Sequence, residues 1–141
     1  MGAAMPRNPY LQMGRLEDVL FLIQYLGLGK SYSLERDSKP DGVKPRSSYD
    51  GLWITVARHH PEFFRVTDKD SVVLAMRYYQ RDGTGDPPPL TVQVVQQLVE
   101  NAIALQERQA KRSEVWKVWG TFLSALIAAL LGIAQLFLVH K

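Results

Sequence analysis

The sequence predicts an α+β protein: a small domain of helices with a β-hairpin, then a long amphipathic helix that runs into a single transmembrane helix. Three observations predict this fold class. Apolar residues recur at helical spacing within 16–26, two short β-prone runs flank a polar turn at 68–70, and 118–139 contains no charged residue. The resulting segments are 1–13, an irregular N-terminal lead-in; 14–80, the domain; 81–90, a Pro/Gly linker; 91–114, the amphipathic juxtamembrane helix; and 115–139, the transmembrane helix.

The first predicted element is a core helix that ends at Gly27 and Gly29. Its apolar positions are Leu16, Val19, Leu20, Ile23 and Leu26. Residues 29–48 are polar and contain Gly and Pro, so we interpret them as a loop with a short helical turn at Leu34. A second helix is predicted to begin near Ser48, a plausible N-cap, and to run through 51–64.

A β-hairpin is predicted after the second helix. One strand covers about 65–67, the turn is Asp68-Lys69-Asp70, and the other strand covers about 72–79. Residues 81–89 (RDGTGDPPP) cannot hold regular structure and form a stiff linker.

The order helix, loop, helix and hairpin is that of a winged-helix domain, and one motif strengthens the comparison. The stretch Trp53-x-x-Val56-x-x-His59-His60-Pro61-Glu62-Phe63-Phe64-Arg65, followed by a turn and 72–78 (VVLAMRY), resembles a winged-helix pattern of bacterial proteins, in a family largely of unassigned function. The resemblance covers about 14–80 and is best over 53–77. It implies a winged-helix-like domain with the hairpin as the wing. It implies no particular activity, because winged helices bind DNA or dock proteins.

No catalytic, cofactor-binding or metal site is expected. The 141 residues include no cysteine, which excludes thiolate chemistry and disulfides. His59 and His60 are adjacent and point about 100° apart on a helix, so they do not form an i, i+4 metal pair. No serine lies in a nucleophile elbow, and Gly83-Thr84-Gly85 lacks the remainder of a phosphate-binding loop. The sequence therefore predicts a protein that is not an enzyme and has no cofactor.

Contact residues for nucleic acid or for a protein partner are predicted on the second helix and the hairpin: Arg58, His59, Arg65, Lys69 and Arg77. Residues 1–90 carry 12 Lys/Arg against 11 Asp/Glu, so the domain is almost neutral. Because phosphate contacts provide most DNA affinity, a near-neutral domain binds DNA weakly. A protein partner is therefore favoured, and nucleic acid is the alternative.

The charge-free run 118–139 spans roughly 33 Å as a helix, enough to cross a hydrocarbon core of about 30 Å. Lys/Arg residues are more frequent before it than after it, which places the N-terminal domain in the cytosol and the C-terminus on the far side. The expected interface anchors are Trp116, Trp119, Lys111, Arg112 and Lys117. The span ends close to the C-terminus, so the sequence predicts a tail-anchored, single-pass membrane protein in a lipid bilayer.

Two features predict assembly. Gly120, Ser124, Ala128 and Gly132 recur every four residues, which is typical of membrane helices that pack closely. The helix at 91–113 is apolar on about half of its circumference. Two interpretations of this apolar face stay open: a stalk that assembles a homo-oligomer, or a face that packs on the chain's own domain.

The predicted function is a non-enzymatic, membrane-anchored winged-helix adaptor that docks a protein partner at the cytosolic membrane face and oligomerises through stalk and span. One alternative is a membrane-tethered, DNA-binding transcriptional regulator. A further alternative is an accessory subunit of a larger membrane complex.

Overall fold

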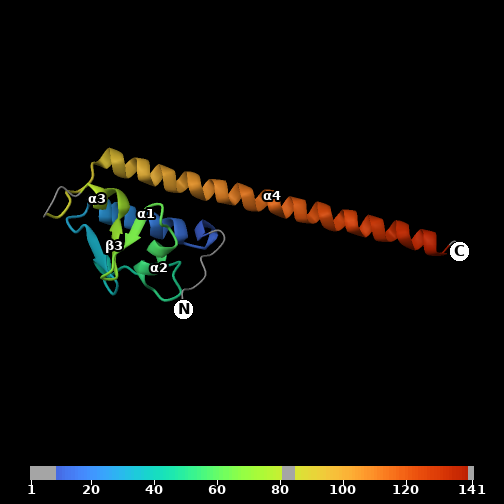
Figure 1. Cartoon of the computed structure of the whole chain (residues 1–141), viewed down its shortest axis with the longest axis horizontal. Coiled ribbons are helices and arrows are strands. Elements are labelled where there is room, and N and C mark those ends of the chain that lie inside the picture. The colour runs from blue at the N-terminus through green and yellow to red at the C-terminus, as the bar shows by residue number, and fades with distance from the viewer. Residues whose placement is uncertain (1–8, 81–84, 140–141) are drawn as a thin grey trace. The chain divides into compact units, whose positions relative to one another are not determined.

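The structure is a computed structural model that describes residues 9–80 and 85–139, apart from the side chains of 116 and 127–139. Its elements, in chain order, are η1 (Pro9–Leu11), α1 (Arg15–Leu28), β1 (Ser33–Glu35), η2 (Pro40–Gly42), α2 (Trp53–Arg58), β2 (Phe64–Val66), β3 (Ser71–Leu74), α3 (Ala75–Tyr79) and α4 (Val92–Val139). Figure 1 labels α1, α2, β3, α3 and α4. The chain forms two compact units, Met1–Gln106 and Glu107–Lys141, and α4 contributes to both. The described fold is therefore a mixture of helices with one small antiparallel sheet.

The sheet has three strands in the order β1–β3–β2, and both pairings are antiparallel. β3 is central: Val72 and Val73 are each paired with a residue of β1 and a residue of β2. β1 was not predicted: the sequence indicated a helical turn at Leu34, which lies in β1 opposite Val72. That prediction was wrong because the extended conformation of 33–35 depends on pairing with a strand far away in the sequence.

The predicted hairpin is confirmed, with a shorter second strand. β2 pairs with β3 from Phe64 opposite Leu74 to Val66 opposite Val72. The strand predicted to reach 79 ends at Leu74, and the chain continues directly as α3. Residues 75–77 are Ala, Met and Arg, which all have high helix propensity.

α1 and α2 pack against each other and against the sheet to form the core of the first unit. The Trp53 side chain is almost fully buried, stacks on Phe21 with ring centroids 4.9 Å apart, and donates a hydrogen bond to the Val43 carbonyl at 3.2 Å. α2 is shorter than predicted at both ends: it begins at Trp53 and ends at Arg58, and Phe64, predicted as its last residue, begins β2. Asp50, in place of Ser48, provides acceptors at the start of α2, taking hydrogen bonds from the backbone N–H of Leu52 at 3.0 Å and from the Thr55 hydroxyl at 2.6 Å.

The first turns of α4 close this core. Val95, Leu98 and Ala102 are buried against it, together with Leu90 from the preceding segment. The Leu90 N–H donates to the Gly27 carbonyl at 2.8 Å. Of the two interpretations left open for the apolar face of 91–113, packing on the chain's own domain is therefore the observed one as far as Ala102.

The predicted transmembrane helix requires correction. Among the described residues, no helix is both long enough and apolar enough to cross a membrane. Charged residues recur along α4 as far as Lys117, and the described side chains that follow, 118–126, cover only roughly 14 Å of helix. The rest of the predicted span, 127–139, lies outside the described side chains. The prediction of a single-pass, tail-anchored membrane protein with a cytosolic domain and a C-terminus on the far side is overturned by this finding.

Candidate functional site

The predicted contact residues lie at the end of α2, in the hairpin and in α3. Arg58 is the last residue of α2, and His59 is its C-terminal cap. Arg65 lies in β2, Lys69 in the turn before β3, and Arg77 in α3. The structure brings Arg58 close to the hairpin turn and buries Arg77, so the five residues do not form one surface.

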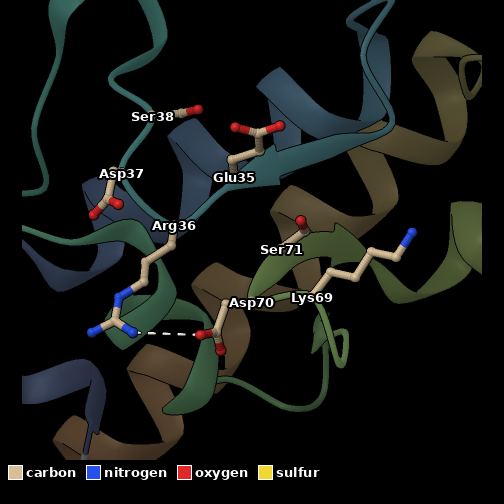
Figure 2. A pocket seen from close by; sticks show the side chains of 7 residues that line it. All are labelled: Glu35, Arg36, Asp37, Ser38, Lys69, Asp70 and Ser71. Atoms are coloured by element: carbon tan, nitrogen blue, oxygen red, sulfur yellow. Dashed lines mark hydrogen bonds and ion pairs between the residues drawn. The ribbon is translucent and has the colours of Figure 1, made fainter.

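Asp70 links the hairpin turn to α2 and to the residue that follows β1. Its Oδ2 lies 3.4 Å from Arg36 Nη1, as Figure 2 shows, and its Oδ1 lies 3.5 Å from Arg58 Nη2. All three side chains are about half exposed, so each pair stabilises the fold by only ~0–1 kcal/mol. Asp70 has a left-handed backbone, with φ 55°, a conformation that Asp adopts more readily than most residues. The charge of Arg58 is therefore partly compensated within the protein.

An open hollow of about 540 Å³ lies beside Asp70. It is lined by Glu35, Arg36, Asp37, Ser38, Lys69, Asp70 and Ser71. In Figure 2 the guanidinium of Arg36 and the ammonium of Lys69 point in different directions, and Glu35 points away from both. In the part of the chain that the structure describes, no group of three or more His, Cys, Asp or Glu residues could hold a metal ion. The hollow presents mixed charges to solvent without a set of groups that converge on one ligand.

Arg77 is only 1% exposed and has a structural role. Its guanidinium donates hydrogen bonds to backbone carbonyl oxygens at distances from 2.7 Å to 3.3 Å; the acceptors belong to Leu26, Gly29, Lys30, Ser31 and Pro87. Burial lowers the pKa of Arg77, and the nearby Asp86 carboxylate opposes this effect. The residue holds the end of α1 and the segment before α4, so a partner cannot reach its charge.

The two histidines differ in exposure. His60 is fully buried, its Nδ1 lies 3.0 Å from Glu62 Oε1, and the Tyr10 hydroxyl donates to the same oxygen at 2.7 Å. The Tyr10 ring also packs on the His60 ring, with centroids 4.3 Å apart. His59 is partly exposed, and burial lowers its pKa, with a further contribution from the positive charge of Arg15. Only His59 of the pair reaches the surface.

The buried residues Asp18 and Arg15 of α1 form a polar cluster that was not predicted from the sequence. The Asp18 carboxylate of α1 accepts hydrogen bonds from the backbone N–H groups of Arg46 at 3.0 Å and Ser47 at 2.7 Å. Arg15 donates to the Ser47 carbonyl at 3.2 Å and to the Gln12 side chain. These contacts fasten the loop before α2 to α1. Nothing in the local sequence pattern indicates the contacts with Arg46 and Ser47, because these residues lie about thirty positions after Arg15 and Asp18.

One exposed cluster has the composition of a binding surface; we call Arg65, Met76 and Tyr79 the α3 patch. The Arg65 guanidinium lies over the Tyr79 ring, 4.9 Å from its centroid, which is cation–π geometry. Tyr79 is 65% exposed and Met76 43% exposed, and residues three apart share one side of a helix. Of these three residues, only Arg65 was predicted as a contact residue. In the strand predicted over 72–79, Met76 and Tyr79 would have pointed to opposite faces.

The predicted helix-packing and anchor residues lie on α4. Added at Gly120, a Cβ atom would have no neighbour within 4 Å, and the Ser124 hydroxyl donates to the Thr121 carbonyl at 2.8 Å. Lys111, Arg112, Lys117 and Trp119 are exposed. Trp116, Ala128 and Gly132 lie outside the described side chains.

No family model, curated protein or solved structure matches the chain. The winged-helix resemblance therefore stays a prediction, and function has to be argued from the residues themselves.

Proposed function

We propose that the protein is a non-enzymatic adaptor whose first unit docks a protein partner through the α3 patch. The observation that carries the proposal is the exposed Tyr79 ring with the Arg65 guanidinium stacked on it and Met76 alongside. Tyr, Met and Arg are the residue types enriched at the centres of protein interfaces. The stack also restricts both side chains before binding, which reduces the entropy cost of ordering them.

The position of the patch supports docking. β2, which carries Arg65, stands at the edge of the three-stranded sheet. A partner segment on the patch would cover the free face of Tyr79 and meet the outer backbone groups of an edge strand. Such a contact combines apolar burial with directional hydrogen bonds, which together give specificity.

The winged-helix resemblance is compatible with the same role, because winged helices dock proteins as well as DNA. Among the cations expected to contact DNA, Arg77 is buried and Arg58 is paired with Asp70. Arg65 is stacked on the Tyr79 ring. Of the four Lys and Arg residues expected to contact DNA, Lys69 is therefore the exposed one for which the described residues show neither an ion pair nor an aromatic contact. DNA binding is therefore the weaker candidate.

Photo-crosslinking tests the docking proposal. p-Benzoylphenylalanine is placed at Tyr79 of the full chain in its own cells, with Tyr49, 84% exposed and outside the patch, as the matched control position. We expect one protein to crosslink in fixed ratio from position 79 but not from position 49, and to be lost on Arg65→Ala combined with Met76→Ala. Equal crosslinking from both positions, or no loss in the double variant, contradicts the proposal.

A DNA titration tests the alternative. We expect the full chain to show only weak binding to duplex DNA by fluorescence anisotropy at physiological salt. Tight, salt-dependent binding that disappears in the Arg58→Ala, Lys69→Ala double variant would replace the adaptor proposal with a DNA-binding one.

A further inference from the structure

Residues 113–126 of α4 are amphipathic. At 100° per residue, the large apolar side chains fall on about half of the circumference. We call this set the apolar arc: Val115, Val118, Trp119, Phe122, Leu123 and Leu126. The opposite side, the polar arc, carries small and polar residues: Ser113, Glu114, Lys117, Gly120, Thr121 and Ser124.

The polar arc satisfies its own hydroxyl groups. The Thr121 hydroxyl donates to the Lys117 carbonyl at 2.9 Å, and Ser124 donates to the Thr121 carbonyl. This side of the helix therefore needs no partner, and Glu114 and Lys117 are exposed on it.

The apolar arc is uncovered in the described structure. Its residues range from 53% exposed at Leu126 to 71% exposed at Phe122. Single exposed apolar residues are normal on a protein surface, but six contiguous ones form a patch of the kind that marks an interaction site. The arc therefore has the character of an interaction surface.

We propose that the apolar arc is an interface with further copies of this chain. Val115, Trp119, Phe122 and Leu126 follow the four-three-four spacing of the a and d positions of a coiled coil, so the arc can interdigitate with a copy of itself. The two preceding heptad positions, 108 and 112, are arginines, so the apolar spacing begins at Val115. This surface shares no residue with the α3 patch.

The area available suits self-association. At roughly 100 Å² of exposed surface for each large side chain, the six residues offer about 600 Å² per copy, so two copies bury about 1,200 Å². That value reaches the lower end of specific interfaces. Val118 and Leu123 flank the a and d positions and widen the contact beyond a two-helix seam.

Sedimentation of the full chain over a wide concentration range tests the interface. The diagnostic variant is Phe122→Glu, and the matched control is Thr121→Glu, which adds the same charge to the neighbouring residue on the polar arc. We expect a discrete oligomer in the wild type and in Thr121→Glu. In Phe122→Glu the association constant should decrease about a hundredfold or more, because a carboxylate would be buried without a partner.

Cysteine substitution gives an independent readout, because the natural chain has no cysteine. Single cysteines at Val115, Trp119, Phe122 and Leu126 sample the arc, and Ser124→Cys is the control on the opposite side. Under oxidation we expect disulfide-linked dimers from at least one arc position and none from Ser124→Cys.

The proposal would be overturned by a wild-type monomer at every concentration, a polydisperse aggregate, equal behaviour of the two glutamate variants, or crosslinking from Ser124→Cys alone. A chain that is monomeric and sediments with phosphatidylcholine vesicles would also overturn it, since lipid and not a second copy would then cover the arc.

Discussion

Arg77 is buried, and among the described residues its guanidinium has no acidic hydrogen-bond partner. Its donors meet backbone carbonyls from 26–31 and from Pro87. Carbonyl groups at the end of a helix lack intrahelical donors, so a guanidinium with five N–H groups can satisfy several of them together. The residue thereby joins the end of α1, the loop after it and the segment before α4.

We expect Arg77→Met to lower the free energy of unfolding of the full chain by about 3–5 kcal/mol, because buried carbonyl groups would lose a charged donor. The matched control is Arg65→Met, which removes the same charge from an exposed position. Urea denaturation followed by circular dichroism measures both. Similar unfolding midpoints for the two variants would show that Arg77 is not the fastening point described here.

Sequence reasoning could not separate Arg77 from Arg65. Both lie in strands that the sequence predicts, 65–67 and 72–79, and charge alone suggests that both contact a partner. The difference arises from acceptors about fifty residues earlier in the chain. The same limit applies to Asp70, whose two arginine partners come from elements that are distant in sequence.

At the scale of elements, α1 packs against α4 at an unusually close point within the first unit. A Cβ added to Gly27 would lie 2.8 Å from Val95 Cγ2, closer than packed atoms allow. Glycine inside a helix costs up to about 1 kcal/mol relative to alanine, so the close approach must outweigh that loss. Gly27 and Gly29 were predicted to end α1. The helix ends at Leu28 with Gly29 as its C-terminal cap, so Gly27 lies inside the helix and serves packing.

We expect Gly27→Ala to destabilise the protein by about 1–3 kcal/mol through overpacking, in spite of the gain in helix propensity. Val95→Ala removes the clashing methyl group, so the double variant should be more stable than the sum of the two single effects predicts. A double-mutant cycle from urea unfolding measures this coupling. Additive effects, or a Gly27→Ala variant that is more stable than the wild type, would contradict the close contact.

Local patterns predicted the elements that depend on local forces. α1 has an apolar face with helical spacing, and the hairpin has β-branched residues beside a polar turn, and both are present. β1 depends on pairing with β3, which local propensity does not record. α2 was predicted to begin too early. The Asp50 side chain accepts a hydrogen bond from the Thr55 hydroxyl and holds 48–52 as a turn before the helix, although the sequence of this segment is compatible with a helix.

At the scale of the molecule, the transmembrane prediction came from counting charges along the chain. Counting does not consider on which side of the helix each residue lies. Around residues 113–126 the polar residues share one arc and the apolar residues the other, whereas a membrane span is apolar on all sides. The α3 patch escaped prediction for a related reason: helix or strand geometry decides which residues share a face.

At the same scale, the first turns of α4 contribute to the stability of the first unit. Val95, Leu98 and Ala102 complete the core of the first unit, and all of them precede its boundary at Gln106. We expect a chain of residues 1–106 to unfold in urea at the same midpoint as the full protein. A chain of residues 1–91 should lose well over 3 kcal/mol, because each buried Val or Leu side chain contributes roughly 1.5–3 kcal/mol. The predicted domain boundary at 80 would be supported instead if residues 1–91 proved as stable as residues 1–106. If 1–106 were clearly less stable than the full chain, the second unit would contribute to the fold of the first.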